Sequence, residues 1–70
     1  MSLLDSFRHD VEAYLRESGM RPTDFSHLAA RDGGFVSALR RGRDCRLSTA
    51  DKVRRWMAEN PPSRFREENR

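Results

Sequence analysis

The segment from Thr23 to Arg43 constrains the fold more than any other part of the chain, because it predicts two short helices that meet at a sharp corner. Apolar residues recur at helical spacing in both halves of the segment: Phe25, Leu28 and Ala29, then Phe35, Val36 and Leu39. Between the two runs lie Asp32, a favourable N-cap, and the flexible pair Gly33-Gly34. The second run ends in a cluster of arginines that begins at Arg40.

Helical signals also flank this segment and predict an all-α, compact four-helix domain. The expected helices run from Leu3 to Ser18 with Gly19 as C-cap, from just after a capping Thr23 to near Arg31, from Gly33 to Arg41, and from a capping box at Ser48 and Asp51 to Asn60. Pro61-Pro62 cannot continue the last helix. No segment alternates apolar and polar residues over the length of a strand.

The chain is long enough for one domain, which we assign to residues 1–60. Residues 61–70 are expected to form a short polar tail that is disordered or takes part in dimerisation, with Phe65 as its apolar residue. The expected core draws on all four helices: Phe7, Val11, Phe25, Val36, Leu39, Val53 and Trp56.

Positive charge is concentrated on and after the second helix of the pair. Residues 31–55 hold eight basic and three acidic residues, a net charge of +5, whereas residues 1–30 carry −2. A basic surface placed there suits a phosphate-bearing partner. The single cysteine, Cys45, excludes an intrachain disulfide, and no apolar run approaches the length of a membrane span, so a cytoplasmic location is expected.

Nine residues are candidates for contact with double-stranded DNA. Basic side chains after the second run could clamp phosphates or contact guanine, and the glycine pair would let the backbone approach the groove. Thr23 and Arg31 flank a helix whose N-terminus could face a phosphate. The candidates are Thr23, Arg31, Gly33, Gly34, Ser37, Arg40, Arg41, Arg43 and Arg46. The alternative for the arginines is a solvated basic surface without a partner.

Other kinds of site find little support in the sequence. His9, His27 and Cys45 contain no local pair with the spacing of zinc ligands, so no metal is expected. The same residues form no catalytic constellation, and no phosphate-cradling loop of the Walker type is present. We therefore expect neither a cofactor nor enzymatic activity.

The stretch from Gly19 to Met57 resembles the Cro/C1-type (XRE-like) helix-turn-helix regulators of bacteria and phages. The elements that carry the resemblance are Phe35-Val36, Leu39 to Arg43, Leu47, Thr49, Val53 and Met57. The likeness covers roughly residues 11–58. The chain departs from the family at Ala30, where the corner often holds glycine, and at Gly33-Gly34, where polar side chains usually contact the bases.

The resemblance implies a homodimeric transcriptional regulator, a repressor of phage or mobile-element origin, whose third helix docks in the major groove of DNA. Two other functions stay open. The first is a protein–protein interaction module on the same fold, such as an antitoxin or a phage inhibitor of a host defence complex. The second is a small RNA-binding protein, which the scarcity of aromatic residues outside the expected core disfavours.

Overall fold

Helices make up all of the regular structure in the computed structural model, which describes the backbone of residues 3–68 and the side chains of residues 4–65. In chain order they are α1 (Leu3–Ser18), α2 (Pro22–Phe25), the π-helix η1 (Ser26–Ala30), α3 (Phe35–Arg40), α4 (Leu47–Glu59) and α5 (Pro62–Glu68). The predicted all-α fold class is therefore confirmed. Within the described part of the chain, none of these helices has both the length and the apolar character needed to span a membrane.

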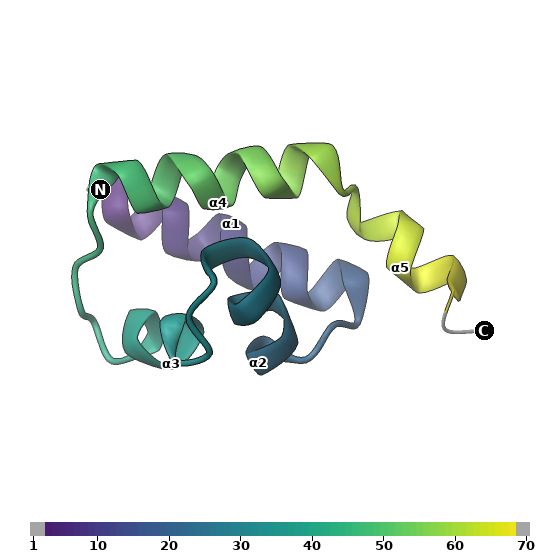
Figure 1. The fold of residues 1–70 in the computed structure, drawn as a ribbon, viewed down its shortest axis with the longest axis horizontal. Helices are drawn as coiled ribbons and strands as arrows, with labels where there is room; N and C mark the ends of the chain where they lie inside the picture. The colour runs from purple at the N-terminus through teal and green to yellow at the C-terminus, as the bar shows by residue number, and fades with distance from the viewer. Residues whose placement is uncertain (1–2, 69–70) are drawn as a thin grey trace.

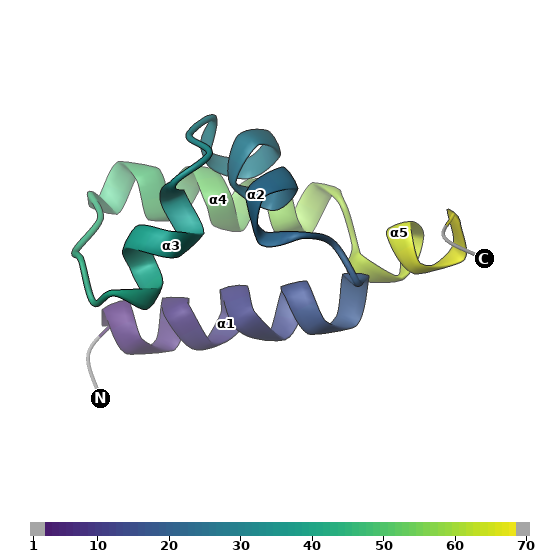
Figure 2. The same ribbon diagram turned by 90° about the horizontal axis from the view of Figure 1, so that it is seen from below.

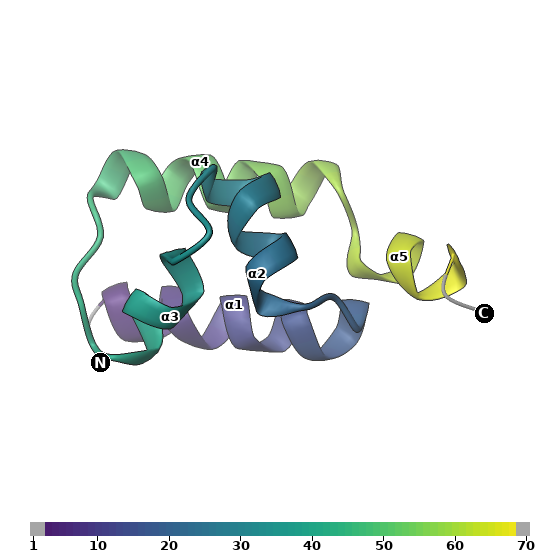
Figure 3. The same cartoon turned by 60° about the horizontal axis from the view of Figure 1, so that its bottom comes forward.

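Two long helices frame the molecule. α1 and α4 run in the same direction along its long axis, and α2, η1 and α3 lie across the space between them (Figures 1 and 3). Figure 2 shows α5 projecting past the end of α1, at the opposite end from the loop that joins α3 to α4. This arrangement leaves the outer sides of α2 and α3 facing away from both long helices.

The core lies where the short helices meet the two long ones. Its buried residues are Phe7, Val11, Tyr14, Leu15, Phe25, Ala29, Phe35, Val36, Leu39 and Val53. Six of the seven predicted core residues are among them, and the seventh, Trp56, is half-buried. The Trp56 ring meets Phe25 and Tyr14 edge-on, with centroids 5.6 and 5.7 Å away. Aromatic pairs in this geometry add to the stabilisation that burial alone provides.

Leu28, which recurs at helical spacing with Phe25 and Ala29, lies outside the core. Leu28 is 53% exposed, whereas Ser26 is completely buried. Phe25, Ser26 and Ala29 form the buried side of this segment, and Leu28 lies on the opposite side. Apolar spacing alone therefore does not identify which residues of this short segment face inward.

The starts of the two helices at the corner differ from the prediction. α2 begins at Pro22 with Arg21 as N-cap, so Thr23 lies inside the first turn and does not cap it. Proline suits the first helical position because its fixed φ is already helical and its missing N–H would have no partner there. α3 begins at Phe35 with Gly34 as N-cap, so Gly33 belongs to the turn. The Asp32 carboxylate accepts a hydrogen bond from the Gly34 N–H at 3.0 Å and stabilises that turn.

α4 also begins earlier than predicted. Its first residue is Leu47 and its N-cap is Arg46, which makes no side-chain capping bond. The predicted capping box at Ser48 and Asp51 is therefore wrong, because both residues already lie inside the helix. Its end at Asn60 and the left-handed Gly19 after α1 are as predicted.

Residues 61–68, treated as part of a polar tail in the sequence analysis, contain the additional helix α5. α5 packs against α1, and the Phe65 ring stacks on Trp56 at a centroid distance of 6.0 Å. The Phe65 ring thus provides one apolar contact between this short helix and the rest of the domain. A role of the segment in dimerisation stays a prediction.

Truncation of Leu39 and truncation of Leu28 should differ in their effect on the free energy of unfolding, because Leu39 is buried and Leu28 is exposed. Leu39→Ala should lower the free energy of unfolding by about 2–5 kcal/mol, because it leaves a cavity in the core. Leu28→Ala should change it by less than about 1 kcal/mol in dilute protein, because this side chain is exposed. Urea denaturation of both variants measures the difference, and equal losses would contradict the orientation of η1.

Candidate nucleic-acid interface

A buried serine hydroxyl joins the two short helices at the corner. Ser26 Oγ donates a hydrogen bond to the Pro22 carbonyl at 2.7 Å and accepts one from the Val36 N–H at 3.1 Å. Val36 lies in the first turn of α3, where backbone N–H groups have no partner inside the helix. Ser26 therefore satisfies the start of α3 from a position ten residues earlier, and so fixes α3 relative to α2 and η1.

The turn between these helices begins at a strained residue. Arg31 has φ +56° and ψ +33°, the left-handed conformation that glycine adopts most easily. Its side chain is exposed, and it has no ion-pair partner among the side chains that the structure describes. The left-handed Arg31 ends η1 as its C-cap, and its N–H donates to the His27 carbonyl at 3.1 Å.

The outer face of α3 consists of Gly34, Ser37 and Arg41. These three residues are exposed and follow one another at helical spacing, while Phe35, Val36 and Leu39 are buried on the opposite side. A Cβ atom at Gly34 would have only the Asp32 carboxylate nearby, at 3.7 Å. We call these three residues the α3 face.

Gly33 has a different role from its neighbour. A Cβ atom built on Gly33 would lie 2.8 Å from the His27 imidazole, closer than real side chains approach. The ring of His27 occupies the space that a larger residue at this position would need. Gly33 therefore lies against the His27 ring, whereas Gly34 belongs to the exposed surface.

Arg40 is already engaged inside the protein. Its Nε and Nη2 atoms donate to the two carboxylate oxygens of Glu12 on α1, at 2.7 and 2.9 Å. This two-pronged hydrogen bond with Arg40 lowers the pKa of the Glu12 carboxyl below its ordinary value. Arg40 therefore ties α3 to α1, and its charge is balanced before any partner arrives.

The other candidate arginines are exposed and free of ion pairs within the described part of the chain. Arg41 lies on the α3 face, and Arg43 and Arg46 border a hollow beside α3 together with Asp32. We call Arg31, Arg41, Arg43 and Arg46 the arginine group. Thr23 is also exposed, in the first turn of α2. The structure thus brings most of the predicted residues to the corner and its flanks, with Arg40 directed to α1 instead.

Two features of this interface escaped the sequence analysis. Glu12 lies 28 residues before Arg40, so no local spacing connects them. Ser26 is polar but completely buried, and its partners become visible only when the corner is folded. The position of Ser26 directly after the predicted core residue Phe25 was the one signal that the sequence offered for the second feature.

The structure points away from reactive chemistry at Cys45. This residue is half-buried in the loop before α4, and burial raises the pKa of its thiol above the ordinary value. A thiol with a raised pKa is a weaker nucleophile at neutral pH. Within the described residues, no three His, Cys, Asp or Glu side chains come together as a metal site.

Comparison of the chain with protein-family models, with curated proteins and with solved structures finds no match.

Arg31→Gly should raise the free energy of unfolding by about 1 kcal/mol, because glycine adopts the left-handed conformation without steric conflict. Arg41→Gly is the matched control, since Arg41 has an ordinary φ of −78°. That variant should not stabilise the protein. Thermal denaturation of both proteins measures the effect, and destabilisation by Arg31→Gly would show that strain is absent at this residue.

The Glu12–Arg40 pair should make stability depend on pH. Because the folded protein lowers the pKa of Glu12, the pair stabilises fully above the ordinary carboxyl value of 4.5 and loses its contribution as the pH falls below it. The contribution should stay under about 1 kcal/mol, because both side chains are partly exposed. Glu12→Gln should reduce the acid sensitivity measured by urea denaturation, whereas Glu17→Gln on the same helix should leave it unchanged.

Proposed function

We propose that this protein is a sequence-specific, double-stranded DNA-binding transcriptional regulator. The observation that carries the proposal is the arginine group, four exposed and unpaired guanidinium groups arranged around the α3 face. The ion pairs among the described side chains use Arg8, Arg40 and Arg54, which lie outside this group, so the charge of the four arginines is available to a phosphate-bearing partner.

The shape of the corner supports the same function. α3 is a short helix with a narrow exposed face, and the turn before it carries Arg31 on one flank. In the proposed complex the α3 face enters the major groove, while Arg31, Arg43 and Arg46 contact the phosphates on either side. Arg41 and Ser37 are the side chains of that face that can donate to base edges. Shape and deformability of the DNA supply further discrimination.

The resemblance to Cro/C1-type regulators supports the proposal further. It favours a repressor that acts in the cytoplasm as a homodimer on a two-fold related site, in a phage or another mobile element. A single module with four free arginines makes few contacts, and two half-sites would raise the affinity. In that complex α2 would cross the sugar–phosphate backbone of the DNA, and Thr23 in the first turn of α2 would lie against it.

Single substitutions of two nearby arginines, one free and one paired with Glu12, test which arginines contact DNA phosphates. Arg43→Ala should weaken binding to a random duplex DNA pool and reduce the slope of log K against log salt by about 0.9, the value for one phosphate contact. Arg40→Ala should leave that slope nearly unchanged, because the charge of Arg40 is balanced by Glu12. Fluorescence anisotropy at several salt concentrations measures both slopes.

Circular dichroism provides the control for folding of both variants. Equal slopes for Arg40→Ala and Arg43→Ala would remove Arg43 from the interface. Absence of DNA binding by the folded wild-type protein, even at low salt, would favour the interpretation as a protein–protein interaction module.

A further inference from the structure

The ion pair between α1 and α3 has the form of an anion site that is already filled. Arg40 donates from Nε and Nη2 to both carboxylate oxygens of Glu12, at 2.7 and 2.9 Å. A guanidinium binds two oxygens of a phosphate group with the same fork of N–H donors. The Glu12 carboxylate therefore lies where an oxyanion from outside the protein would be held by these two donors.

A second arginine lies close to this carboxylate. The hydrogen bond from Arg40 lowers the pKa of the Glu12 carboxyl most, and the charge of Arg16 lowers it further. Arg16 is exposed and has no ion pair among the described side chains. Both arginines and Glu12 line an open hollow of about 340 Å³ between α1 and the start of α2. Without the charge of Glu12, the lining of this hollow would carry two positive charges and no negative one.

The location and exposure of the ion pair suit contact with a phosphate. The Arg40 side chain is 50% exposed and that of Glu12 is 37% exposed, so water and salt reach both groups. An ion pair of this kind contributes little to stability, and its loss leaves the fold intact. The hollow also contains Pro22 at the start of α2 and Arg40 at the end of α3, the two helices that would contact DNA in the proposed complex.

We propose that Glu12 occupies a phosphate subsite formed by Arg16 and Arg40, and that it thereby lowers the affinity of the protein for DNA of any sequence. Contacts to phosphate provide most of the binding to non-specific DNA, so a masked cation weakens that binding. Discrimination between sequences is left to the α3 face, and Glu12 therefore raises the ratio of specific to non-specific affinity. The assignment of the phosphate to DNA rests on the proposed function, whereas the subsite itself does not.

Removal of one charge tests the effect on DNA binding. Glu12→Gln keeps the size of the side chain and should steepen the slope of log K against log salt by about 0.9, the value for one further phosphate contact. Glu17→Gln, at an exposed position of α1 outside the hollow, controls for the change in net charge and should not steepen it. In the Arg40→Ala background, Glu12→Gln should lose most of its effect. Fluorescence anisotropy with a random duplex pool measures the slopes, and circular dichroism checks the fold.

Inorganic pyrophosphate, added without DNA, tests the subsite independently of the proposed function. A ligand that binds only the folded protein raises its stability. At matched ionic strength, pyrophosphate should raise the urea midpoint of Glu12→Gln more than that of the wild-type protein or of the double variant with Arg40→Ala. Equal increases in the three proteins, or an undiminished effect of Glu12→Gln on the DNA slope in the Arg40→Ala background, would overturn the subsite. The expected pyrophosphate effect without any DNA binding would support the subsite and contradict only the proposed function.

Discussion

The buried hydroxyl of Ser26 is the interaction on which the proposed function depends most. It accepts the Val36 N–H and donates to the Pro22 carbonyl, so one side chain serves backbone groups of both short helices. A buried N–H without a partner costs free energy comparable to a lost hydrogen bond. Apolar side chains can pack together in more than one arrangement, whereas this pair of hydrogen bonds forms in only one. The polar contact therefore fixes the orientation of α3 relative to α2.

Electrostatic pairing divides the arginines into two kinds. Arg40 and Arg54 reach back to Glu12 and Asp10 on α1, and the Arg54 guanidinium also lies 5.3 Å from the centre of the Phe7 ring. Those two arginines connect the corner and α4 to the first helix. The net charge of +5 on residues 31–55 thus overstates the charge available to a partner, since α1 balances part of it.

Local sequence patterns predicted the features that depend only on neighbouring residues, such as where a helix ends. α1 ends at Ser18 and Gly19 follows in a left-handed conformation, as the apolar periodicity and the glycine indicated. Leu28 shares the helical spacing of Phe25 and Ala29 but is exposed, and the polar Ser26 lies inward instead because it bonds the Val36 N–H across the corner. The partner of Arg40 and the position of Phe65 on Trp56 also depend on contacts between distant segments. Of the candidate interface, residue types and approximate location were predictable, but not which cations are free.

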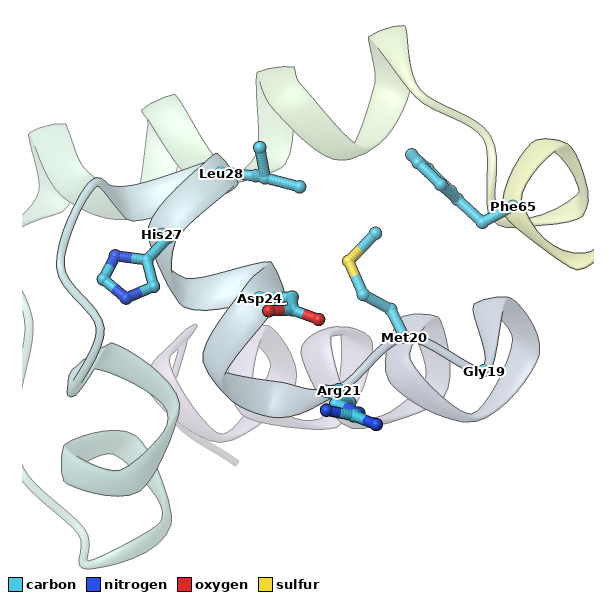
Figure 4. Close-up of a pocket in the computed structure, with 7 residues that line it drawn as sticks. All are labelled: Gly19, Met20, Arg21, Asp24, His27, Leu28 and Phe65. Carbon is cyan, nitrogen blue, oxygen red and sulfur yellow. The ribbon is translucent and has the colours of Figure 1, made fainter. Parts of the chain in front are cut away.

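The single tryptophan joins two parts of the molecule that differ in how firmly they are held. One edge of Trp56 packs on Phe25 and Tyr14, and Phe65 of α5 stacks on its ring. α5 is a seven-residue terminal helix, and local opening of such a helix requires less free energy than unfolding of the core. Phe65 also lines a hollow of about 520 Å³ together with Met20 and Leu28 (Figure 4). Opening of α5 would therefore remove one wall of this hollow and expose one face of the Trp56 ring.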